Sequence, residues 1–201
     1  MSQPNPLVSS LSSLTNFNGY DISCYGFNDG AISASISGSV PPYSLLWNTG
    51  DQFEPLTTLY ADNYVLSVVD ENNCQIVDSI LLSQPYPLSS NISSAFNYNG
   101  YDISCYNYSD GGVDLSVFGG VSPYNFMWNT NETLEDLSNL SAGNYDVSIS
   151  DNNGCQIANN IILNHPTPLT LSLSSSDYNG FNVSCFGFND GFINSFVKGS
   201  A

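Results

Sequence analysis

The sequence has almost no positive charge. It contains one lysine and no arginine against 18 acidic residues, which gives a formal net charge of −17. Such a chain has no basic patch to attract phosphates or anionic lipid, so we expect no nucleic-acid partner. Salt bridges cannot be a general feature, because Lys198 alone could neutralise a carboxylate by pairing with it. Since no apolar run approaches membrane-spanning length, we also expect no insertion into a membrane.

Charged residues of either sign are scarce, so uncharged polar side chains must provide most of the hydrated surface. Charged residues make up 9% of the chain, whereas 33 serines and 26 asparagines supply uncharged polar groups. Apolar residues reach 41% and aromatic residues 13%. A unit of about 80 residues with this composition can bury a small core, although domains of this size are marginal without reinforcement.

One phrase occurs three times. "GYDISCYGFNDG" begins at Gly19 and returns as "GYDISCYNYSDG" at Gly100 and "GFNVSCFGFNDG" at Gly180, spacings of 81 and 80 residues. A fixed period of this kind indicates tandem repeats. We call the Pro-containing connection between two repeats a seam. The chain then divides into the end of a preceding seam (1–5), repeat 1 (6–86), repeat 2 (87–167) and the opening of a repeat 3 (168–201). This division predicts a piece of a longer array; the alternative is that 168–201 is shared with repeat 2.

Alternation and turn residues predict β structure throughout. Tyr145, Val147 and Ile149 fall on one face of a strand that precedes an Asp-Asn-Asn-Gly break. Asn99-Gly100 is a favoured two-residue turn. We expect strands near 7–14, 20–25, 31–37, 43–48, 55–60, 63–69 and 74–82, and their equivalents in repeat 2. The strand at 20–25 would point Cys24 inward, and Gly30 would take positive φ in the next turn. The predicted fold is all-β, with tandem Ig-like antiparallel β-sandwiches of period about 81 residues.

The cysteines fit this fold. Each full repeat has two cysteines separated by 50 residues with one tryptophan between them, similar to the inter-sheet Cys, Trp, Cys pattern of Ig domains. We therefore predict disulfides Cys24–Cys74 and Cys105–Cys155, with Cys185 unpaired in this sequence. A pairing of Cys74 with Cys105 across the seam is the alternative.

Several motifs recur in fixed order. They are "C-x-G-x-N-D-G", "P-P-Y-x-x-x-W-x-x-G", "A-x-N-Y-x-x-x-V-x-D-x-N-x-C" and a final "QP". This order resembles the SprB-repeat family, found in very large surface adhesins of gliding and other Bacteroidota. The match departs in detail, since Gly26 becomes Asn107 and the loop 52–59 differs between repeats. The resemblance implies a secreted, surface-attached module with an adhesive or structural role.

Residues that could carry catalysis are not repeated. His165 stands where repeat 1 has Gln84, and the pair Asp70-Glu71 becomes Asp151-Asn152. General acid–base chemistry needs both groups held together, so we interpret His165 as a linker residue. We find no nucleophile with a base, no phosphate loop and no zinc spacing. The sequence indicates a non-enzymatic protein.

Two kinds of modification or ligand remain open. Carboxylates in tight turns could bind structural calcium, although Asp and Asn are also common turn residues; the candidates are Asp29, Asp70, Asp110, Asp151 and Asp190. No other cofactor is expected. The "DSI" at Asp78 resembles a Bacteroidota O-glycosylation pattern and marks Ser79.

Three functions are compatible with this sequence. The first is an extracellular stalk or adhesive module of tandem sandwiches joined by Pro-rich seams, whose partners are neighbouring repeats or copies of itself. The second is a self-assembling extracellular filament. The third is a carbohydrate-binding module that would contact surface glycans through exposed rings. The candidate rings are Tyr20, Tyr25, Phe27, Tyr43 and Tyr60.

Overall fold

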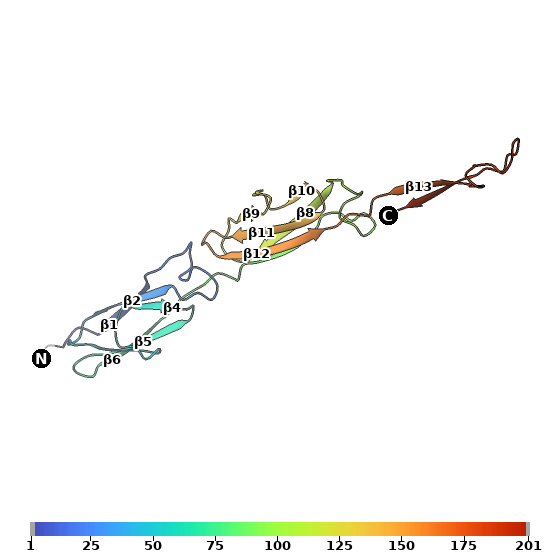
Figure 1. The fold of residues 1–201 in the computed structure, drawn as a ribbon. Coiled ribbons are helices and arrows are strands. Elements are labelled where there is room, and N and C mark those ends of the chain that lie inside the picture. The colour runs from blue at the N-terminus through green and yellow to red at the C-terminus, as the bar shows by residue number, and fades with distance from the viewer. Residues whose placement is uncertain (1–2, 200–201) are drawn as a thin grey trace.

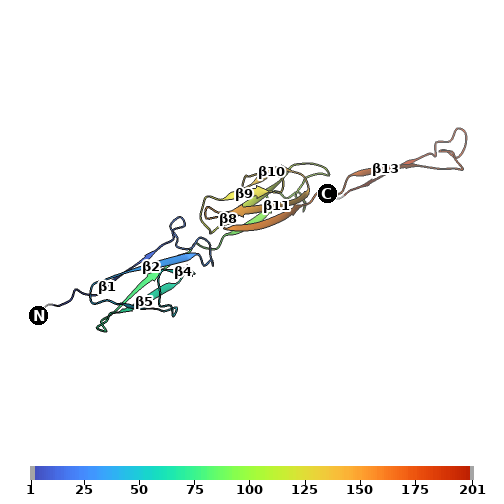
Figure 2. The same ribbon diagram turned by 60° about the vertical axis from the view of Figure 1, so that its left-hand side comes forward.

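The computed structural model describes residues 3–199 and arranges them in a row. Two β-sandwiches follow one another, and a hairpin extends beyond the second (Figure 1). The same linear arrangement is seen after a 60° rotation (Figure 2). Within residues 3–199 no helix has the length and apolar character needed to cross a bilayer.

The first sandwich packs two three-stranded antiparallel sheets face to face. One sheet has the order β1-β2-β4 and the other β3-β5-β6. The strands are β1 (Val8–Ser13), β2 (Gly30–Ser37), β3 (Ser44–Trp47), β4 (Leu56–Leu59), β5 (Asn63–Val69) and β6 (Gln75–Leu81). Side chains join the sheets along one edge, where the Ser9 hydroxyl on β1 donates to Asp78 Oδ2 on β6 at 2.9 Å.

The second sandwich repeats this topology. Its sheets have the orders β10-β8-β7 and β12-β11-β9. The strands are β7 (Ser89–Ser94), β8 (Gly111–Phe118), β9 (Asn125–Trp128), β10 (Leu137–Leu140), β11 (Gly143–Ser150) and β12 (Gln156–Leu163). At the equivalent edge, Asn159 Nδ2 donates to the Ser90 hydroxyl at 3.2 Å. The predicted all-β, antiparallel, Ig-like class is confirmed.

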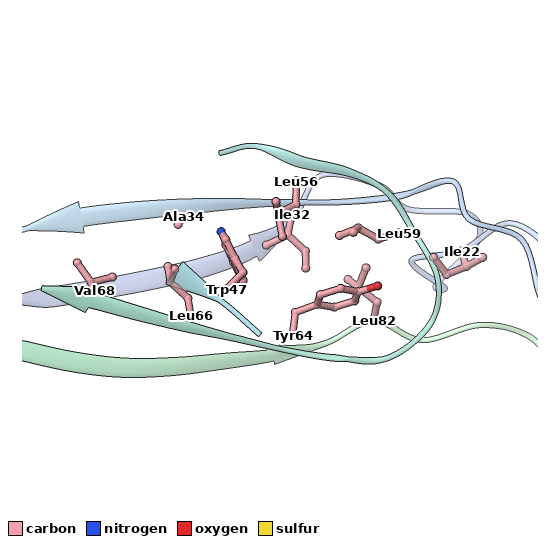
Figure 3. Packing of buried hydrophobic residues seen from close by; sticks show 10 residues of the cluster. All are labelled: Ile22, Ile32, Ala34, Trp47, Leu56, Leu59, Tyr64, Leu66, Val68 and Leu82. Atoms are coloured by element: carbon pink, nitrogen blue, oxygen red, sulfur yellow. The ribbon is translucent and has the colours of Figure 1, made fainter. Parts of the chain in front are cut away.

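Each sandwich has its own core around one tryptophan. In the first, Trp47 lies between the sheets with Leu66 and Ile32, and each is at most 1% exposed (Figure 3). Trp128 has the same place in the second core. Its Nε1 donates to Leu134 O at 2.9 Å, whereas Trp47 Nε1 has no hydrogen-bond partner. The difference arises in the loop after the tryptophan, where the two repeats differ in sequence.

A tyrosine holds the corner before the long hairpin in both sandwiches. The Tyr64 hydroxyl donates to Tyr60 O at 3.0 Å, and the Tyr145 hydroxyl donates to Ser141 O at 2.8 Å. A hydroxyl bonded to backbone a few residues upstream is typical of the tyrosine corner of Ig-like folds. As predicted, Tyr145, Val147 and Ile149 all point into the core, and none is more than 7% exposed.

The predicted strand at 20–25 is wrong. Residues 21–26 form bends and turns, preceded by an isolated bridge between Phe17 and Tyr20. Gly30 also differs from the prediction: it does not take positive φ but begins β2. A Cβ at Gly30 would lie 2.5 Å from Ile22 Cδ1 and 3.0 Å from Leu59 O. The glycine therefore serves the close approach of this loop to the core rather than a turn.

The last part of the described chain is a hairpin of β13 (Thr170–Ser175) and β14 (Ile193–Lys198), which pair only with each other. Every residue of both strands is exposed. Phe181 and Val183 are 71% and 40% exposed, so these side chains do not pack on repeat 2 as the alternative would require.

Candidate functional site: the joint between repeats

The two sandwiches are joined by a disulfide between Cys24 and Cys155, 131 residues apart in sequence. Cys24 lies in the loop 17–29 of the first sandwich, which we call the socket loop. Cys155 ends the turn 151–155 between β11 and β12, which we call the cysteine turn. The predicted pairs Cys24–Cys74 and Cys105–Cys155 are wrong, and so is the alternative Cys74–Cys105, because Cys74 and Cys105 are both free.

The socket loop is shaped by a turn at its start and a carboxylate at its end. Asn18 and Gly19 have φ of 52° and 95°, so both central residues of this tight turn are left-handed. At the other end, Asp29 accepts hydrogen bonds from the Ser23 amide at 3.1 Å and the Ser23 hydroxyl at 2.5 Å. These bonds close the loop with Ile22 in the core and Cys24 directed outward. Alternating strand faces would have put both residues on one side.

A second carboxylate fastens the socket loop to its own sandwich. Asp21 Oδ2 accepts from the amide and hydroxyl of Ser83, at 2.9 and 2.8 Å. In return, Ser83 O accepts from the amides of Asp21 and Ile22 at 3.1 and 3.0 Å. Because Ser83 follows the last strand of the first sandwich, the socket loop and the seam to the next repeat are held as one unit.

The cysteine turn is organised by the buried Asp151, which is 3% exposed. Its Oδ1 accepts from the amides of Asn153 and Cys155, both at 2.9 Å, and its Oδ2 accepts from the Val121 amide at 2.8 Å. A carboxylate with several backbone donors fixes a turn strongly. The side chains of Asn153 and Cys155 are therefore presented together, toward the neighbouring repeat.

Asp70 organises the equivalent turn of the first repeat. Its Oδ1 accepts from the amides of Asn72 and Cys74 at 2.9 and 2.7 Å, and its Oδ2 accepts from the Ser39 hydroxyl. The hydroxyl bond of Ser39, followed by these backbone bonds, lowers the pKa of Asp70 below its ordinary value. The same turn is thus organised by a carboxylate in both repeats.

Asn153 makes the polar contacts across the joint. Its Nδ2 donates to Ser23 O at 2.8 Å and to Phe17 O at 3.3 Å, and its Oδ1 accepts from Asn18 Nδ2 at 2.6 Å. One asparagine side chain thereby uses donors and acceptor on the socket loop. The contact also hides the loop, since Cys24 is 5% exposed whereas its counterpart Cys105 is exposed.

The calcium candidates all accept hydrogen bonds from backbone amides or serine hydroxyls of their own repeat. Asp110 and Asp190 accept from the amides of Ser104 and Ser184, at 3.1 and 3.0 Å, as Asp29 does from Ser23. Among residues 3–199 no three His, Cys, Asp or Glu side chains gather where they could hold a metal ion. These carboxylates bind their own backbone, which accounts for their recurrence in each repeat.

Of the remaining candidates, Ser79 and His165 lie away from the joint between the two sandwiches. Ser79 is exposed on the edge strand β6, and its O-glycosylation stays a prediction. His165 packs edge-on against Tyr106 with ring centroids 4.9 Å apart, in the seam after the second sandwich. Of the candidate rings, Tyr25, Phe27 and Tyr60 are 57%, 54% and 57% exposed, whereas Tyr43 packs against the core.

Comparison with known proteins bears on the same segments. The family model described as "SprB repeat" matches residues 18–52 and 99–133, which begin in the socket loop and in the equivalent loop of the second sandwich. Two segments of the chain thus match the SprB-repeat model. The predicted resemblance is confirmed, and the matched residues in each copy run from the socket loop through the tryptophan of the core. No curated protein is significantly similar to the chain. Among solved structures, the amphioxus IgVJ-C2 molecule is similar at 13% identity and a TM-score of 0.30, over 63% of this chain and 90% of that one.

The residues that form the joint were not recognisable from the sequence pattern. Asn153 lies in the predicted Asp-Asn-Asn-Gly break and Asn18 is the equivalent of the predicted turn residue Asn99, yet their side chains bond to each other across the joint. A signal was present: the motifs "NGYDISC" and "D-x-N-x-C" recur with the same period. If one motif binds the other in the next repeat, the two must recur together. Period alone cannot reveal whether the partner lies in the same repeat or in the following one.

Proposed function

We propose that the chain is a non-enzymatic structural module of a large extracellular surface protein, in which SprB repeats form a stalk or filament. The observation that carries this proposal is the joint, where a disulfide and the Asn153 side chain both fix one repeat on the next. Repeat proteins whose units contact only their neighbours become extended, quasi-one-dimensional objects. A fixed joint turns such a row into a stiff spacer that can hold a binding surface away from the cell.

An extracellular location agrees with the chemistry of this joint. Disulfides persist in oxidising environments and are rare in reducing ones. The joint relies on one, and each carboxylate-fastened turn presents a cysteine beside it. The surface is negatively charged and rich in serine and asparagine, which favours repulsion between neighbouring rods and solubility outside the cell.

Small-angle X-ray scattering of the oxidised chain tests the stalk. We expect the profile of a single extended particle whose scattering fits the linear arrangement of both sandwiches (Figure 2). Scattering that requires a broad mixture of bent arrangements in the oxidised chain would contradict a stiff spacer.

Glycan binding is a second candidate. It is favoured by exposed rings beside Cys24 in the socket loop and beside Cys105 in the equivalent loop of the second sandwich. Tyr25 and Phe27 flank Cys24 at 57% and 54% exposure, and Tyr106 and Tyr108 flank Cys105 at 44% and 57%. Exposed aromatic rings stack on the apolar faces of sugars. A glycan array probed with the chain and with its Tyr25→Ala/Phe27→Ala variant tests this role. Binding that the variant loses would support an adhesive function, and an array without binding would leave the stalk alone.

A further inference from the structure

The free cysteines occupy the positions that are bonded at the joint. Cys105 and Cys185 stand in the repeated phrase where Cys24 stands, and Cys74 stands in its turn where Cys155 stands. Each free cysteine is thus one half of a joint of which the chain shows a complete example.

The segment around Cys105 has the same construction as the socket loop, although no cysteine turn within residues 3–199 is bonded to it. Its opening turn has the same left-handed pair, Asn99 at φ 52° and Gly100 at 93°. Its closing carboxylate, Asp110, accepts from the Ser104 amide at 3.1 Å and hydroxyl at 2.5 Å. Asp102 Oδ2 accepts from the amide of Asn164, as Asp21 Oδ2 does from that of Ser83.

An open pocket lies beside this second socket. Its volume is about 410 Å³, and Cys105, Tyr106, Pro168 and Leu169 are among its lining residues. The equivalent pocket beside Cys24 has about 200 Å³ and is lined in part by Cys155, from the cysteine turn of the next repeat. The larger space at Cys105 lies where the first joint holds that turn.

The hairpin β13–β14 has an apolar face, and the second sandwich shows which kind of segment covers the equivalent face. By the repeat alignment, Leu173, Ile193 and Val197 correspond to Ile92, Val113 and Val117, which pack in the second core. The three are 65%, 75% and 58% exposed. In the second sandwich this face is covered by the sheet β9-β11-β12, and the cysteine turn links two strands of that covering sheet.

We propose that the apolar face of β13–β14 and the Cys105 socket together bind one further segment, supplied by continuation of the chain and equivalent to residues 122–167, which contain the sheet β9-β11-β12. The cysteine of its turn forms a disulfide with Cys105, so that each repeat is bonded to the next. This inference rests on the proposed stalk function and specifies how that stalk is assembled.

The covalent step is an ordinary oxidation. Two thiols lose two protons and two electrons to form one S–S bond. The electrons reduce the disulfide of an oxidant such as oxidised glutathione to two thiols, by thiolate attack through a mixed disulfide. No group of the chain other than the two cysteines is consumed.

The direct test extends the chain after Ala201 with a second copy of residues 122–167. The purified protein is oxidised in a glutathione buffer, alkylated and mapped as non-reduced peptides. We expect Cys105 to be linked to the appended cysteine and protected from alkylation. In the matched control, whose appended copy carries Cys155→Ser, Cys105 stays open to alkylation. Linkage of the appended cysteine to Cys185 would overturn the proposal, because the bond would then lie within one repeat.

A second measurement uses the chain without extension, so that it does not depend on folding of the appended part. The probe is a synthetic peptide of residues 150–157 whose cysteine carries thionitrobenzoate. The thiolate of Cys105 attacks the peptide sulfur and releases the coloured thionitrobenzoate anion. We expect Cys105 to react about fivefold faster than Cys74, the effect of one net hydrogen bond. The preference should be lost with an Asn153→Ala peptide.

Two results of this measurement would contradict the proposal. One is equal labelling of Cys105 and Cys74, or a preference that the Asn153→Ala peptide retains. The other is a disulfide between Cys74 of one copy and Cys105 of another in the absence of peptide, which would assign the socket to a second copy. Neither result concerns Cys24–Cys155, so the stalk function is tested separately by scattering.

Discussion

Replacing Cys24 with serine removes the covalent link between the two sandwiches but leaves both cores intact. Neither core cluster includes a cysteine, and the tryptophan of each is 1% exposed. Tryptophan fluorescence of the Cys24→Ser variant in buffer should therefore match that of the parent chain. The change should appear only on denaturation.

The magnitude follows from the length of the closed loop. A disulfide across a sequence separation of 131 residues destabilises the unfolded chain by about 5 kcal/mol in the chain-entropy model, because it removes conformational entropy. This is an upper value for the decrease that Cys24→Ser causes in the summed free energy of unfolding of the two sandwiches, because each sandwich is also held by its own core. We expect urea denaturation of Cys24→Ser to show a lower midpoint than that of the oxidised parent.

The matched control is Cys74→Ser, which changes a free, exposed cysteine. Its urea midpoint should equal that of the parent. A reducing agent should lower the parent midpoint to that of Cys24→Ser and leave the variant unchanged. If Cys74→Ser were destabilised as much as Cys24→Ser, the two cysteines would be partners and the joint described here would be wrong.

Three further predictions concern the loops and the charge. Gly30→Ala should destabilise by about 1–3 kcal/mol through overpacking on Ile22, whereas Gly143→Ala, with nothing within 4 Å, should not; equal urea midpoints would refute the close approach. The Ser104 hydroxyl bond lowers the pKa of Asp110, so its stabilisation is present above the unfolded pKa of about 3.9 and is lost as pH falls through the lower folded pKa. The difference in Tm between the parent and Asp110→Asn should accordingly shrink below about pH 4, and a constant difference would contradict this role. Because the net charge is −17, Tm should rise between low salt and 1 M NaCl, where the Debye length is about 3 Å; a flat Tm would show that repulsion is negligible.

Much of the sandwich could be predicted from the sequence because its strands carry strict alternation. Tyr145, Val147 and Ile149 must share a face in any extended strand, and the burial of that face requires a second sheet. The Asn99-Gly100 turn was predictable for a similar reason, since few residue pairs adopt two positive φ values in succession.

The socket loop could not be predicted in this way. Its apparent alternation of Tyr20, Ile22 and Cys24 resembles a strand, but Asp29 takes the Ser23 amide and hydroxyl and closes a loop instead. That bond directs Cys24 away from the core that contains Ile22. Local side-chain bonds to backbone compete with strand formation, and their geometry is not written in the hydrophobic pattern.

The disulfide was missed for a different reason. A spacing of 50 residues within each repeat and the Ig-like position of the tryptophan both favoured pairing inside a repeat. In tandem repeats every cysteine has equivalents one period away, so sequence alone leaves the choice of partner open. What decides it is the outward direction of Cys24, which brings it to Cys155 of the following repeat.

The measurement that tests the joint most directly is non-reducing peptide mapping of the oxidised, alkylated chain. Digestion with pepsin keeps the solution acidic, so that few thiolates are present to exchange disulfides. We predict one cross-linked species that joins peptides containing Cys24 and Cys155, with Cys74, Cys105 and Cys185 recovered alkylated. Recovery of Cys24 linked to Cys74, together with Cys105 linked to Cys155, would contradict the covalent joint between repeats.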